Sequence, residues 1–349
     1  MSNRNKAKVC IVGTGRVAHH YMMLKEKGFL DGIEFVSCYD LSESKASDFA
    51  IKYGLELLRS LNALDQALID FAIVSTPSGT HYEVGRECVS RHIPTLIEKP
   101  ITLRVEEANE LEEFAKSNKV LVKSVFQNRY NLAIKEAKSI LDSGQLGKIV
   151  TFSLRTLWCR YQEYYEDDWH GKWASDGGVS SQQAIHHLDA LNYLIGLPDN
   201  LCAFAGNRVN ELEAEDTLVA IFNICGMLGT GQFTTAIRPR DLEASITIIG
   251  EQSSLRVSGV ALNRLELLDS KGEYITTVEQ KFENGYGLGH AELLKEFSLL
   301  LQGHESSYLP SCQDSIKALM VVDALYESVE SGKVINVQRT QSRSKLGIK

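Results

Sequence analysis

The chain has 349 residues, of which 44% are hydrophobic, and a formal net charge of −8. This length suffices for two domains with a large core, whereas the acidic balance argues against a nucleic-acid surface, which needs a basic stripe. No apolar run approaches the ~20 residues of a membrane helix, and no secretory signal precedes the first predicted strand. We expect a cytoplasmic protein that binds neither nucleic acid nor membrane.

The seven cysteines are scattered along the chain, and no two of them form a C-x-x-C pair. An odd number without paired spacing predicts neither a disulfide framework nor a zinc site, and we expect no metal. Most of the cysteines fall inside predicted strands or helices, where they resemble small buried hydrophobes. This usage is consistent with a reducing compartment.

The first 125 residues alternate short apolar runs with amphipathic segments. This alternation is typical of a parallel α/β sheet and predicts a first domain over residues 1–125. The predicted strands are 8–12, 33–39, 70–75, 94–98 and 120–124, and the predicted helices are 17–27, 42–53, 80–90 and 105–118.

After a helix predicted at 132–143, strands follow one another with few helices between them. This succession predicts a second, α+β domain over 126–337 with a mostly antiparallel, open-faced sheet, followed by a polar tail at 338–349. An uncovered face predicts a homodimer or homotetramer through this sheet. The predicted strands are 148–160, 201–209, 216–225, 228–236, 243–249, 254–257, 264–268 and 274–278; the predicted helices are 181–195, 289–301 and 312–331, the last able to pack back on the first domain.

The run Gly13-Thr14-Gly15-Arg16-Val17-Ala18 matches G-x-G-x-x-A, directly after a strand and opening a helix. The first glycine allows the tight turn, the second lets a pyrophosphate approach the backbone, and the helix N-terminus favours an anion. Asp40 ends the second strand, where a carboxylate binds the ribose hydroxyls and repels a 2′-phosphate. The fingerprint therefore predicts an NAD-binding Rossmann domain, although Asp40 also fits a simple turn before the next helix.

Two loops of the first domain add candidates. Ser75-Thr76-Pro77 follows a strand and is expected to pass beside the cofactor, while His81 is either a cofactor neighbour or an ordinary first-turn helix residue. Glu98-Lys99-Pro100 closes another strand, at the carboxyl edge where such sheets bind ligands. A lysine there can stabilise a developing alkoxide, and Pro100 makes a cis bond plausible. The plainer alternative is an exposed Lys99 paired with Glu98.

The segment that begins at Asp176-Gly177-Gly178 enters a helix carrying Gln182, His186 and Asp189 at i, i+4 and i+7. This spacing places the three polar side chains on one face. Histidine is the side chain best suited to proton transfer near neutral pH. A structural histidine is the alternative interpretation.

Together these motifs resemble the glucose–fructose oxidoreductase/inositol dehydrogenase/MocA family over nearly the whole chain. The resemblance implies an NAD(P)-dependent sugar dehydrogenase acting on CH–OH, with Lys99 and His186 as the catalytic pair and with Glu98 and Gln127 near the cofactor. Two positions depart from the family pattern: Gln182 replaces its usual aspartate, and Leu132 its usual proline. The motifs that carry the resemblance are the Gly13 fingerprint, Ser75-Thr76-Pro77, Glu98-Lys99-Pro100, Gln127-Asn128-Arg129-Tyr130-Asn131 and the segment 177–189.

Within the family, Glu215-Asp216-Thr217 and the segment 238–250 are most similar to the branch acting at C3 of UDP-N-acetylglucosaminuronate in surface-polysaccharide synthesis. Arginines can clamp a diphosphate or carboxylate, and aromatic rings can stack on uracil or a sugar face. Solvated loop charges and core or interface packing are the alternatives. The candidates are Arg155, Arg160, Arg238 and Arg240, with Tyr161, Tyr164, Tyr165, Trp169 and Trp173; Gln182 and Asp189 complete the expected substrate-binding set.

Two further functions compete with this prediction. The first is a dehydrogenase of free sugars or inositols, which needs no nucleotide pocket; the arginine- and aromatic-rich loop weighs against it. The second is a non-catalytic NAD-binding sensor. The presence of both Lys99 and His186 weighs against a sensor, because a sensor has no use for the catalytic pair.

Overall fold

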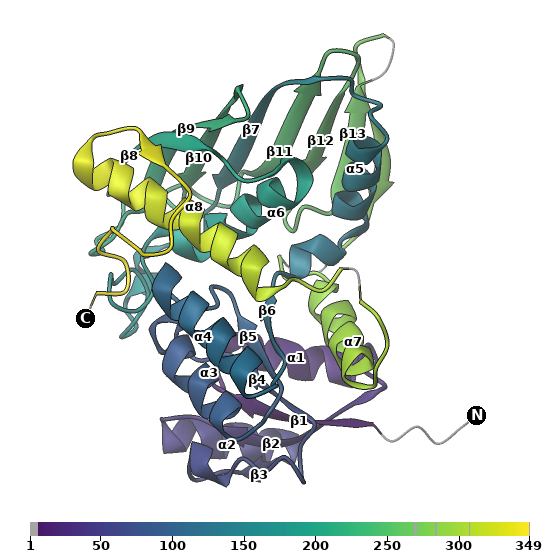
Figure 1. The fold of residues 1–349 in the computed structure, drawn as a ribbon, viewed down its shortest axis with the longest axis vertical. Coiled ribbons are helices and arrows are strands. Elements are labelled where there is room, and N and C mark those ends of the chain that lie inside the picture. Colours follow the sequence, from purple (N-terminus) through teal and green to yellow (C-terminus); the bar gives the residue numbers. More distant parts are fainter. Residues whose placement is uncertain (1–5, 269–270, 283–284, 307, 349) are drawn as a thin grey trace. The chain divides into compact units, whose positions relative to one another are not determined.

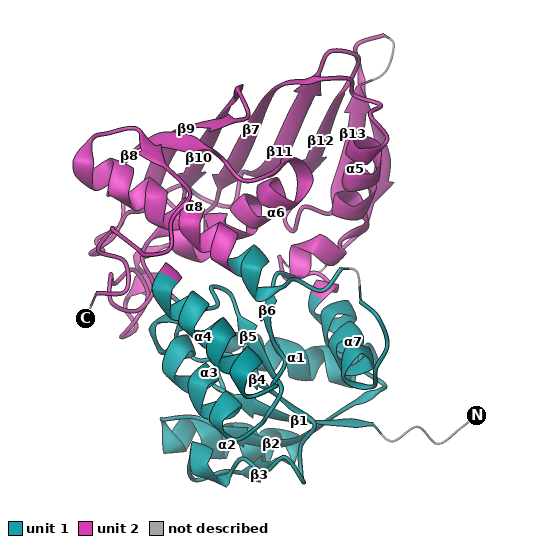
Figure 2. Ribbon diagram, viewed as in Figure 1, with its two compact units in different colours: residues 1–102, 106–126, 290–315 teal, residues 103–105, 127–289, 316–349 magenta. Residues whose placement is uncertain are grey.

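The computed structural model describes residues 6–268, 271–282, 285–306 and 308–348, and they form two compact units (Figure 2). The first unit comprises residues 1–102, 106–126 and 290–315, and the second comprises 103–105, 127–289 and 316–349. Residue 126 is thus a boundary between the two units. The segment 290–315, however, belongs to the first unit and not to the second.

The sheet of the first unit has six parallel strands in the order β3-β2-β1-β4-β5-β6. This order is that of the doubly wound dinucleotide-binding fold, and it confirms the predicted fold class. The central strands are buried along almost their whole length, as expected for apolar strands covered on both faces. The strands are β1 (Ala7–Val12), β2 (Ile33–Tyr39), β3 (Glu56–Leu57), β4 (Phe71–Val74), β5 (Thr95–Glu98) and β6 (Val122–Val125).

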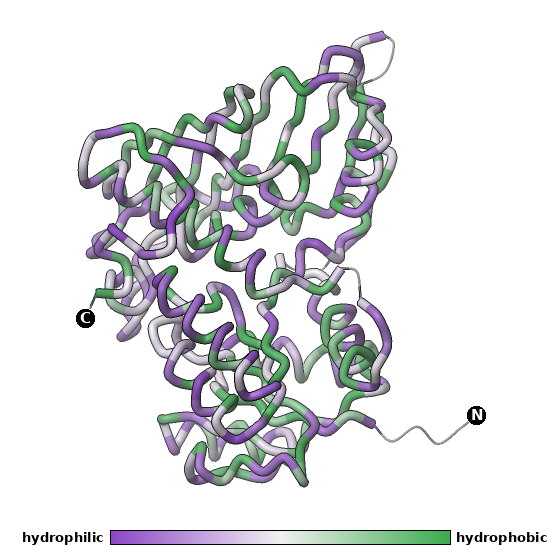
Figure 3. Tube along the Cα trace, in the orientation of Figure 1, coloured by the Kyte–Doolittle hydropathy of each residue, from purple (hydrophilic) through white to green (hydrophobic). Residues whose placement is uncertain are grey.

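Helices cover both faces of this sheet. On one face, a side chain added at Gly85 of α3 would press on Ile97 of β5. On the other face, Phe297 of α7 packs edge-on against Phe71 of β4, with ring centroids 5.1 Å apart. Along α2, α3 and α4 the hydropathy alternates, as expected for helices with one buried face (Figure 3). The helices are α1 (Arg16–Glu26), α2 (Glu43–Tyr53), α3 (His81–Ser90), α4 (Val105–Ser117) and α7 (Gly289–Leu301).

The second unit contains a nine-stranded sheet in the order β14-β13-β12-β11-β7-β10-β9-β8-β15 (Figure 1). Its pairs are antiparallel except for β7 with β10, so the predicted mostly antiparallel sheet is confirmed. The strands are β7 (Ile149–Leu157), β8 (Asn200–Gly206), β9 (Thr217–Ile224), β10 (Met227–Thr234), β11 (Glu243–Gly250), β12 (Ser254–Ser258), β13 (Arg264–Leu268), β14 (Tyr274–Glu279) and β15 (Ile335–Asn336).

Three helices, α5 (Leu132–Asp142), α6 (Ile185–Ile195) and α8 (Cys312–Ser331), lie along one face of this sheet (Figure 1). Burial along β9 alternates between buried and exposed positions, so the opposite face is open. A π-helical turn, Ser180–Ala184, precedes α6. In the described ranges, no helix combines the length and the apolar character needed to cross a membrane.

The predicted polar tail packs against α8. Arg339 donates to the buried Asp323 of α8 over 2.5 Å, and the backbone N–H groups of Arg343 and Ser344 donate to the same carboxylate. Leu346 is almost fully buried. The sequence showed only the polar composition of this segment, because its partners lie on a helix earlier in the chain.

Candidate functional site

The fingerprint turn has the shape that a dinucleotide requires. Gly13 has a φ of +97°, and a Cβ there would lie 2.5 Å from the Ser75 carbonyl carbon, so only glycine fits. Gly15 caps the N-terminus of α1, and a Cβ there would have no neighbour within 4 Å, which leaves room for a pyrophosphate. Arg16 and Val17 open the helix, no acidic residue occupies its first turn, and Ala18 is fully buried. These residues fit a bound NAD.

Asp40 links the fingerprint to the next helix. One carboxylate oxygen accepts hydrogen bonds from the N–H and the hydroxyl of Thr14, at 2.8 and 3.0 Å, and the other accepts the N–H of Ser42 at 2.9 Å. The side chain thus combines the turn role with a negative charge beside the glycine turn. A negative charge at this position would repel the 2′-phosphate of NADP.

We expect Asp40→Ser to weaken the preference for NAD over NADP. Removing the carboxylate removes the repulsion of a 2′-phosphate, so the ratio of kcat/KM for the two cofactors should fall at least ~10-fold, equivalent to ~1.4 kcal/mol. Steady-state kinetics with both cofactors measures this ratio, with Asp65→Ser on an exposed turn as the control. An unchanged ratio would show that the selection lies elsewhere.

His81 joins two loops beside the cofactor fingerprint. Its ring is almost fully buried, with Nδ1 2.6 Å from the Pro100 carbonyl and Nε2 2.9 Å from the Thr76 carbonyl. The Ser75 hydroxyl in turn donates to the Gly13 carbonyl over 2.8 Å. Burial lowers the pKa of His81. The neutral ring carries one N–H and can donate to only one of these two carbonyls. Its burial between the Thr76-Pro77 loop and the end of β5 weighs against a contact with the cofactor.

Glu98 and Lys99, at the end of β5, differ in burial. The Glu98 carboxylate is buried and accepts the Tyr21 hydroxyl over 2.6 Å, with Nε2 of His290 at 3.5 Å, whereas Lys99 is half-buried. Burial raises the pKa of Glu98, but the contacts with His290 and Tyr21 outweigh it and hold that pKa below its usual value. The Lys99–Pro100 bond is cis, as expected. The Glu98 carboxylate is thus engaged by Tyr21 and His290, which weighs against a side-chain contact with the cofactor.

Two adjacent histidines of α6 differ sharply. His187 is fully buried, and burial lowers its pKa to about 3, while His186 is half-buried. Gln182, one turn earlier, donates to the buried Asp176 over 2.6 Å, and Asp176 also accepts the Gly171 N–H. Of the two rings, that of His186 is the more accessible.

Asp189 has a structural partner that the sequence analysis missed. The Arg129 guanidinium donates to both Asp189 oxygens, at 2.9 and 2.6 Å, and both side chains are buried. The pair ties the 3₁₀ turn Gln127–Tyr130 to α6. Gln127 itself is buried in this turn. The Asp189 carboxylate is thereby engaged by Arg129, which weighs against the substrate contact expected from the sequence.

Glu215 holds the start of the helical segment that carries His186. Its carboxylate accepts the Ser180 N–H at 2.9 Å and the Tyr326 hydroxyl at 3.1 Å, and its carbonyl accepts the Val179 N–H. A Cβ at Gly178 would lie 2.2 Å from the Glu215 carbonyl oxygen, which explains that glycine. Burial raises the pKa of Glu215 to about 7. The sequence signal for Glu215 was only the branch motif, without a role.

We expect Glu215→Gln to remove a pH dependence of stability. The pKa of Glu215 rises from 4.5 to about 7 on folding, so the folded state binds more protons and wild-type stability falls as the pH rises through this window. Between pH 5 and pH 8, the free energy of unfolding of the variant should therefore rise relative to that of the wild type, by on the order of 3 kcal/mol. Urea unfolding of both proteins at both pH values measures the difference. If the stability of the variant and of the wild type changed equally with pH, the raised pKa of Glu215 would be contradicted.

The expected arginines and aromatic residues gather before α6 and after β10. Arg238 lies over the Tyr161 ring at 4.5 Å, and Arg160 lies over Trp158 and bonds to Asp241. Trp169 stacks on the buried His170, with centroids 3.7 Å apart. In the same segment before α6, Tyr164 packs on Tyr165, Tyr165 bonds to Thr235, and Trp173 packs on Tyr326. Arg155 of β7 pairs with Glu243, and Arg240 is exposed.

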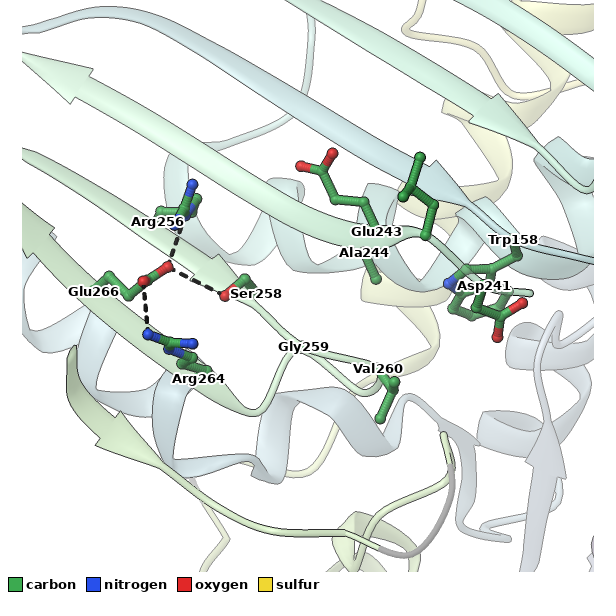
Figure 4. Close-up of a pocket in the computed structure, with 11 residues that line it drawn as sticks. Trp158, Asp241, Glu243, Ala244, Arg256, Ser258, Gly259, Val260, Arg264 and Glu266 are labelled. Carbon is green, nitrogen blue, oxygen red and sulfur yellow. Dashed lines mark hydrogen bonds and ion pairs between the residues drawn. The ribbon is translucent and has the colours of Figure 1, made fainter. Parts of the chain in front are cut away.

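A cavity of about 320 Å³ lies on the open face of the second sheet, among β11, β12 and β13. Arg256 and Arg264 flank the buried Glu266 there, at 2.7 and 3.1 Å (Figure 4). The bond from Arg256 holds the pKa of Glu266 below its usual value. Because the two arginines already share a carboxylate, and because neither Lys99 nor His186 lines this cavity, we do not assign the reaction to it.

Two family models match the chain. The first, described as the oxidoreductase family with an NAD-binding Rossmann fold, matches residues 7–126, and the second, the GFO/IDH/MocA C-terminal domain, matches residues 134–256. The chain belongs to the GFO/IDH/MocA family. It is an NAD-binding oxidoreductase that acts on CH–OH groups of sugars or inositols. In the described part of the chain, no group of three His, Cys, Asp or Glu residues is arranged to hold a metal.

Relatives with a named activity cover most of the chain. Glucose-6-phosphate 3-dehydrogenase of Bacillus subtilis is 22% identical over 95% of this chain and 98% of its own. The NAD-dependent scyllo-inositol 2-dehydrogenase of the same organism is 22% identical over 81% and 84%. Among solved structures, the WlbA dehydrogenase of Bordetella pertussis with NADH and UDP-GlcNAcA is 28% identical, with a TM-score of 0.84 over 96% of this chain and 100% of its own.

Proposed function

We propose that this GFO/IDH/MocA enzyme oxidises C3 of a UDP-linked N-acetylamino-sugar uronate with NAD, in the synthesis of a surface polysaccharide. The similarity to WlbA carries the proposal. A second WlbA dehydrogenase, that of Chromobacterium violaceum in complex with NADH and UDP-GlcNAcA, is 27% identical and has the same TM-score of 0.84. Levoglucosan dehydrogenase shares the fold at only 18% identity.

The reaction assigns distinct tasks to side chains of this chain. Bound NAD supplies the hydride acceptor. His186 accepts the proton of the reacting hydroxyl, since it is the more accessible of the two α6 histidines. Lys99 donates to the same oxygen and stabilises the developing alkoxide. Gln182 cannot take up a proton, so it orients a substrate hydroxyl and leaves the proton transfer to His186.

The cationic and aromatic residues around Tyr161 are proposed to hold the nucleotide. Arg238 over Tyr161, and Arg160 over Trp158, place guanidinium groups beside flat rings within the second unit. Guanidinium groups suit a diphosphate, and the rings suit uracil. Arg155, Arg240 and Trp169 are further candidates for these contacts.

Calorimetry of the NADH-loaded protein against UDP, UDP-N-acetylglucosaminuronate, glucose 6-phosphate and inositol tests this function. We expect micromolar binding of the UDP-sugar and detectable binding of UDP alone. Binding of neither UDP compound would overturn the nucleotide-sugar assignment. Binding of glucose 6-phosphate instead would favour the second candidate, a dehydrogenase of sugars without a nucleotide, which the full-length match to glucose-6-phosphate 3-dehydrogenase supports.

We further propose a homodimer or homotetramer through the open face of the second sheet. Phe204 is 77% exposed there, and Ile221 on the neighbouring strand is 58% exposed. Exposed apolar side chains on one face are costly unless covered. We expect Phe204→Glu with Ile221→Glu to produce monomers in light scattering, whereas Ile51→Glu on α2, also exposed, should not. An unchanged mass would refute this interface.

The proposed compartment is the cytoplasm. All seven cysteines are free thiols, and four of them are buried, which suits a reducing environment.

A further inference from the structure

Residues 344–348, here called the C-terminal strap, have a fixed place in the second unit. Asp323 of α8 accepts hydrogen bonds from the N–H and the hydroxyl of Ser344, at 3.0 and 2.6 Å. Arg104 donates to the Leu346 carbonyl over 3.0 Å, and the Leu346 side chain is only 1% exposed. All of these residues belong to the second unit. The strap is therefore held by its backbone and by one buried apolar side chain.

The strap contacts Trp173, in the segment that precedes α6. The Gly347 N–H donates to the Trp173 carbonyl over 2.8 Å, and the Lys345 ammonium lies over the indole ring, 4.3 Å from its centroid. Tyr326 of α8 packs edge-on against the same ring, with centroids 5.0 Å apart. The indole N–H donates to the Glu213 carbonyl over 2.9 Å. These contacts fix Trp173 within the protein and weigh against its stacking on a substrate.

Leu346 of the strap packs on the glycine pair that follows Trp173. A Cβ at Gly177 would lie 2.8 Å from Cδ1 of Leu346 and 3.0 Å from the Tyr326 hydroxyl, so this close approach requires a glycine. The Tyr326 hydroxyl also accepts the Gly178 N–H over 2.9 Å. The glycine pair is thus held by the strap and by α8. Removal of the Leu346 side chain would leave a cavity beside this backbone.

The turn 173–178 carries the carboxylate that orients Gln182. Asp176 is 2% exposed; one of its oxygens accepts a hydrogen bond from Nε2 of Gln182 at 2.6 Å, and the other accepts the Gly171 N–H at 3.0 Å. An ionised carboxylate only accepts hydrogen bonds, so the Nε2 end of the Gln182 amide faces Asp176. His186 follows Gln182 by four residues. A shift of the turn therefore moves the group that orients Gln182 and the start of the helical segment that carries His186.

We propose that Leu346 is a positioning residue for the sugar-binding part of the site: it packs on Gly177 and so holds the turn from which Asp176 orients Gln182. This inference rests on the proposed roles of Gln182 and His186. A misplacement of about 1 Å at reacting groups can cost ~100-fold in rate, so a buried leucine that acts only through the turn affects turnover. The cofactor fingerprint lies in the first unit, so the affinity for NADH is independent of the strap.

Amide hydrogen exchange of the full chain without ligands tests the contact independently of turnover. We expect Leu346→Ala to speed exchange at the amides of residues 177–182 at least ~10-fold, while the amides of β11 keep their wild-type rate. Leu346→Met, which refills most of the volume, should restore slow exchange. Ile348→Ala is the matched control, since Ile348 lies in the same strap and is 55% exposed. Unchanged exchange at 177–182, or equal acceleration in β11, would overturn the inference.

Steady-state kinetics with the UDP-sugar tests the consequence for the reaction. Leu346→Ala should lower kcat/KM for the sugar about 10-fold, with an unchanged Kd for NADH. Normal kcat/KM despite faster exchange would refute the positioning role. Leu346→Val removes a single carbon and covers the case in which Leu346→Ala does not fold; it should show a smaller acceleration at the same amides, and none would refute the contact. Failure of the proposed function would instead show as absent turnover of UDP-sugars by the wild type, with the exchange pattern still present.

Discussion

Replacement of His186 by asparagine is expected to lower kcat at least ~100-fold while leaving the affinity for NAD unchanged. A positioned histidine contributes ~10²–10⁴-fold through proton transfer, and asparagine keeps a hydrogen-bonding side chain that cannot take up a proton. The fingerprint and Asp40 lie in the first unit, while His186 lies in the second, so cofactor affinity provides an internal check. Stopped-flow kinetics and fluorescence titration with NADH measure the two quantities.

His187→Leu is the matched control for that experiment. Neither ring nitrogen of His187 has a hydrogen-bond partner within the described ranges, and an apolar replacement of such a group is close to neutral. We expect this variant to fold and to turn over at nearly the wild-type rate. If His186→Asn retained normal turnover, or if His187→Leu lost it, the assignment of the base to His186 would be wrong.

The second large effect concerns stability. Asp189→Ala leaves the buried Arg129 guanidinium without the carboxylate that binds it through two hydrogen bonds. Loss of one partner of a buried ion pair costs about 3–5 kcal/mol, a large part of the ~5–15 kcal/mol that stabilises a typical domain. Urea unfolding of the variant and the wild type measures the loss, as a lower midpoint with an unchanged slope.

A double substitution separates this structural role from substrate binding. Arg129→Met with Asp189→Leu removes both charges and should recover most of the stability lost in Asp189→Ala. If Asp189→Ala were as stable as wild type but had a raised KM for the sugar, Asp189 would instead be the substrate ligand that the sequence analysis expected.

The periodic elements were the part of the fold most readily predicted from sequence. The limits of β2, β13, α7 and α8 agree with the predicted ranges, because continuous apolar runs and helical periodicity are local properties. The strands β3 and β15 have two residues each, too few for any pattern. α7 belongs to the first unit because of contacts such as that of Phe297 with Phe71. These residues are far apart in the sequence, so no local pattern predicts the contact.

The same distinction explains the site. Motifs with a fixed spacing, such as the glycine fingerprint and the 182–189 face, were visible in the sequence. The residues that hold these motifs in place were not visible. Tyr326 contacts Glu215 from 111 positions away, and His290 contacts Glu98 from 192 positions away. Arg129 stands in the polar run Gln127-Asn128-Arg129-Tyr130-Asn131, so its neighbours in the sequence gave no sign of a buried partner.

The discontinuity of the first unit affects how the protein is made. A nascent chain that has reached residue 126 contains every strand of the nucleotide-binding sheet, but Phe71 and Glu98 still lack Phe297 and His290. Domains generally fold as units while the ribosome extends the chain. Here the nucleotide-binding unit must wait, partly uncovered, until strands β7 to β14 have been synthesised and residues 290–315 have emerged.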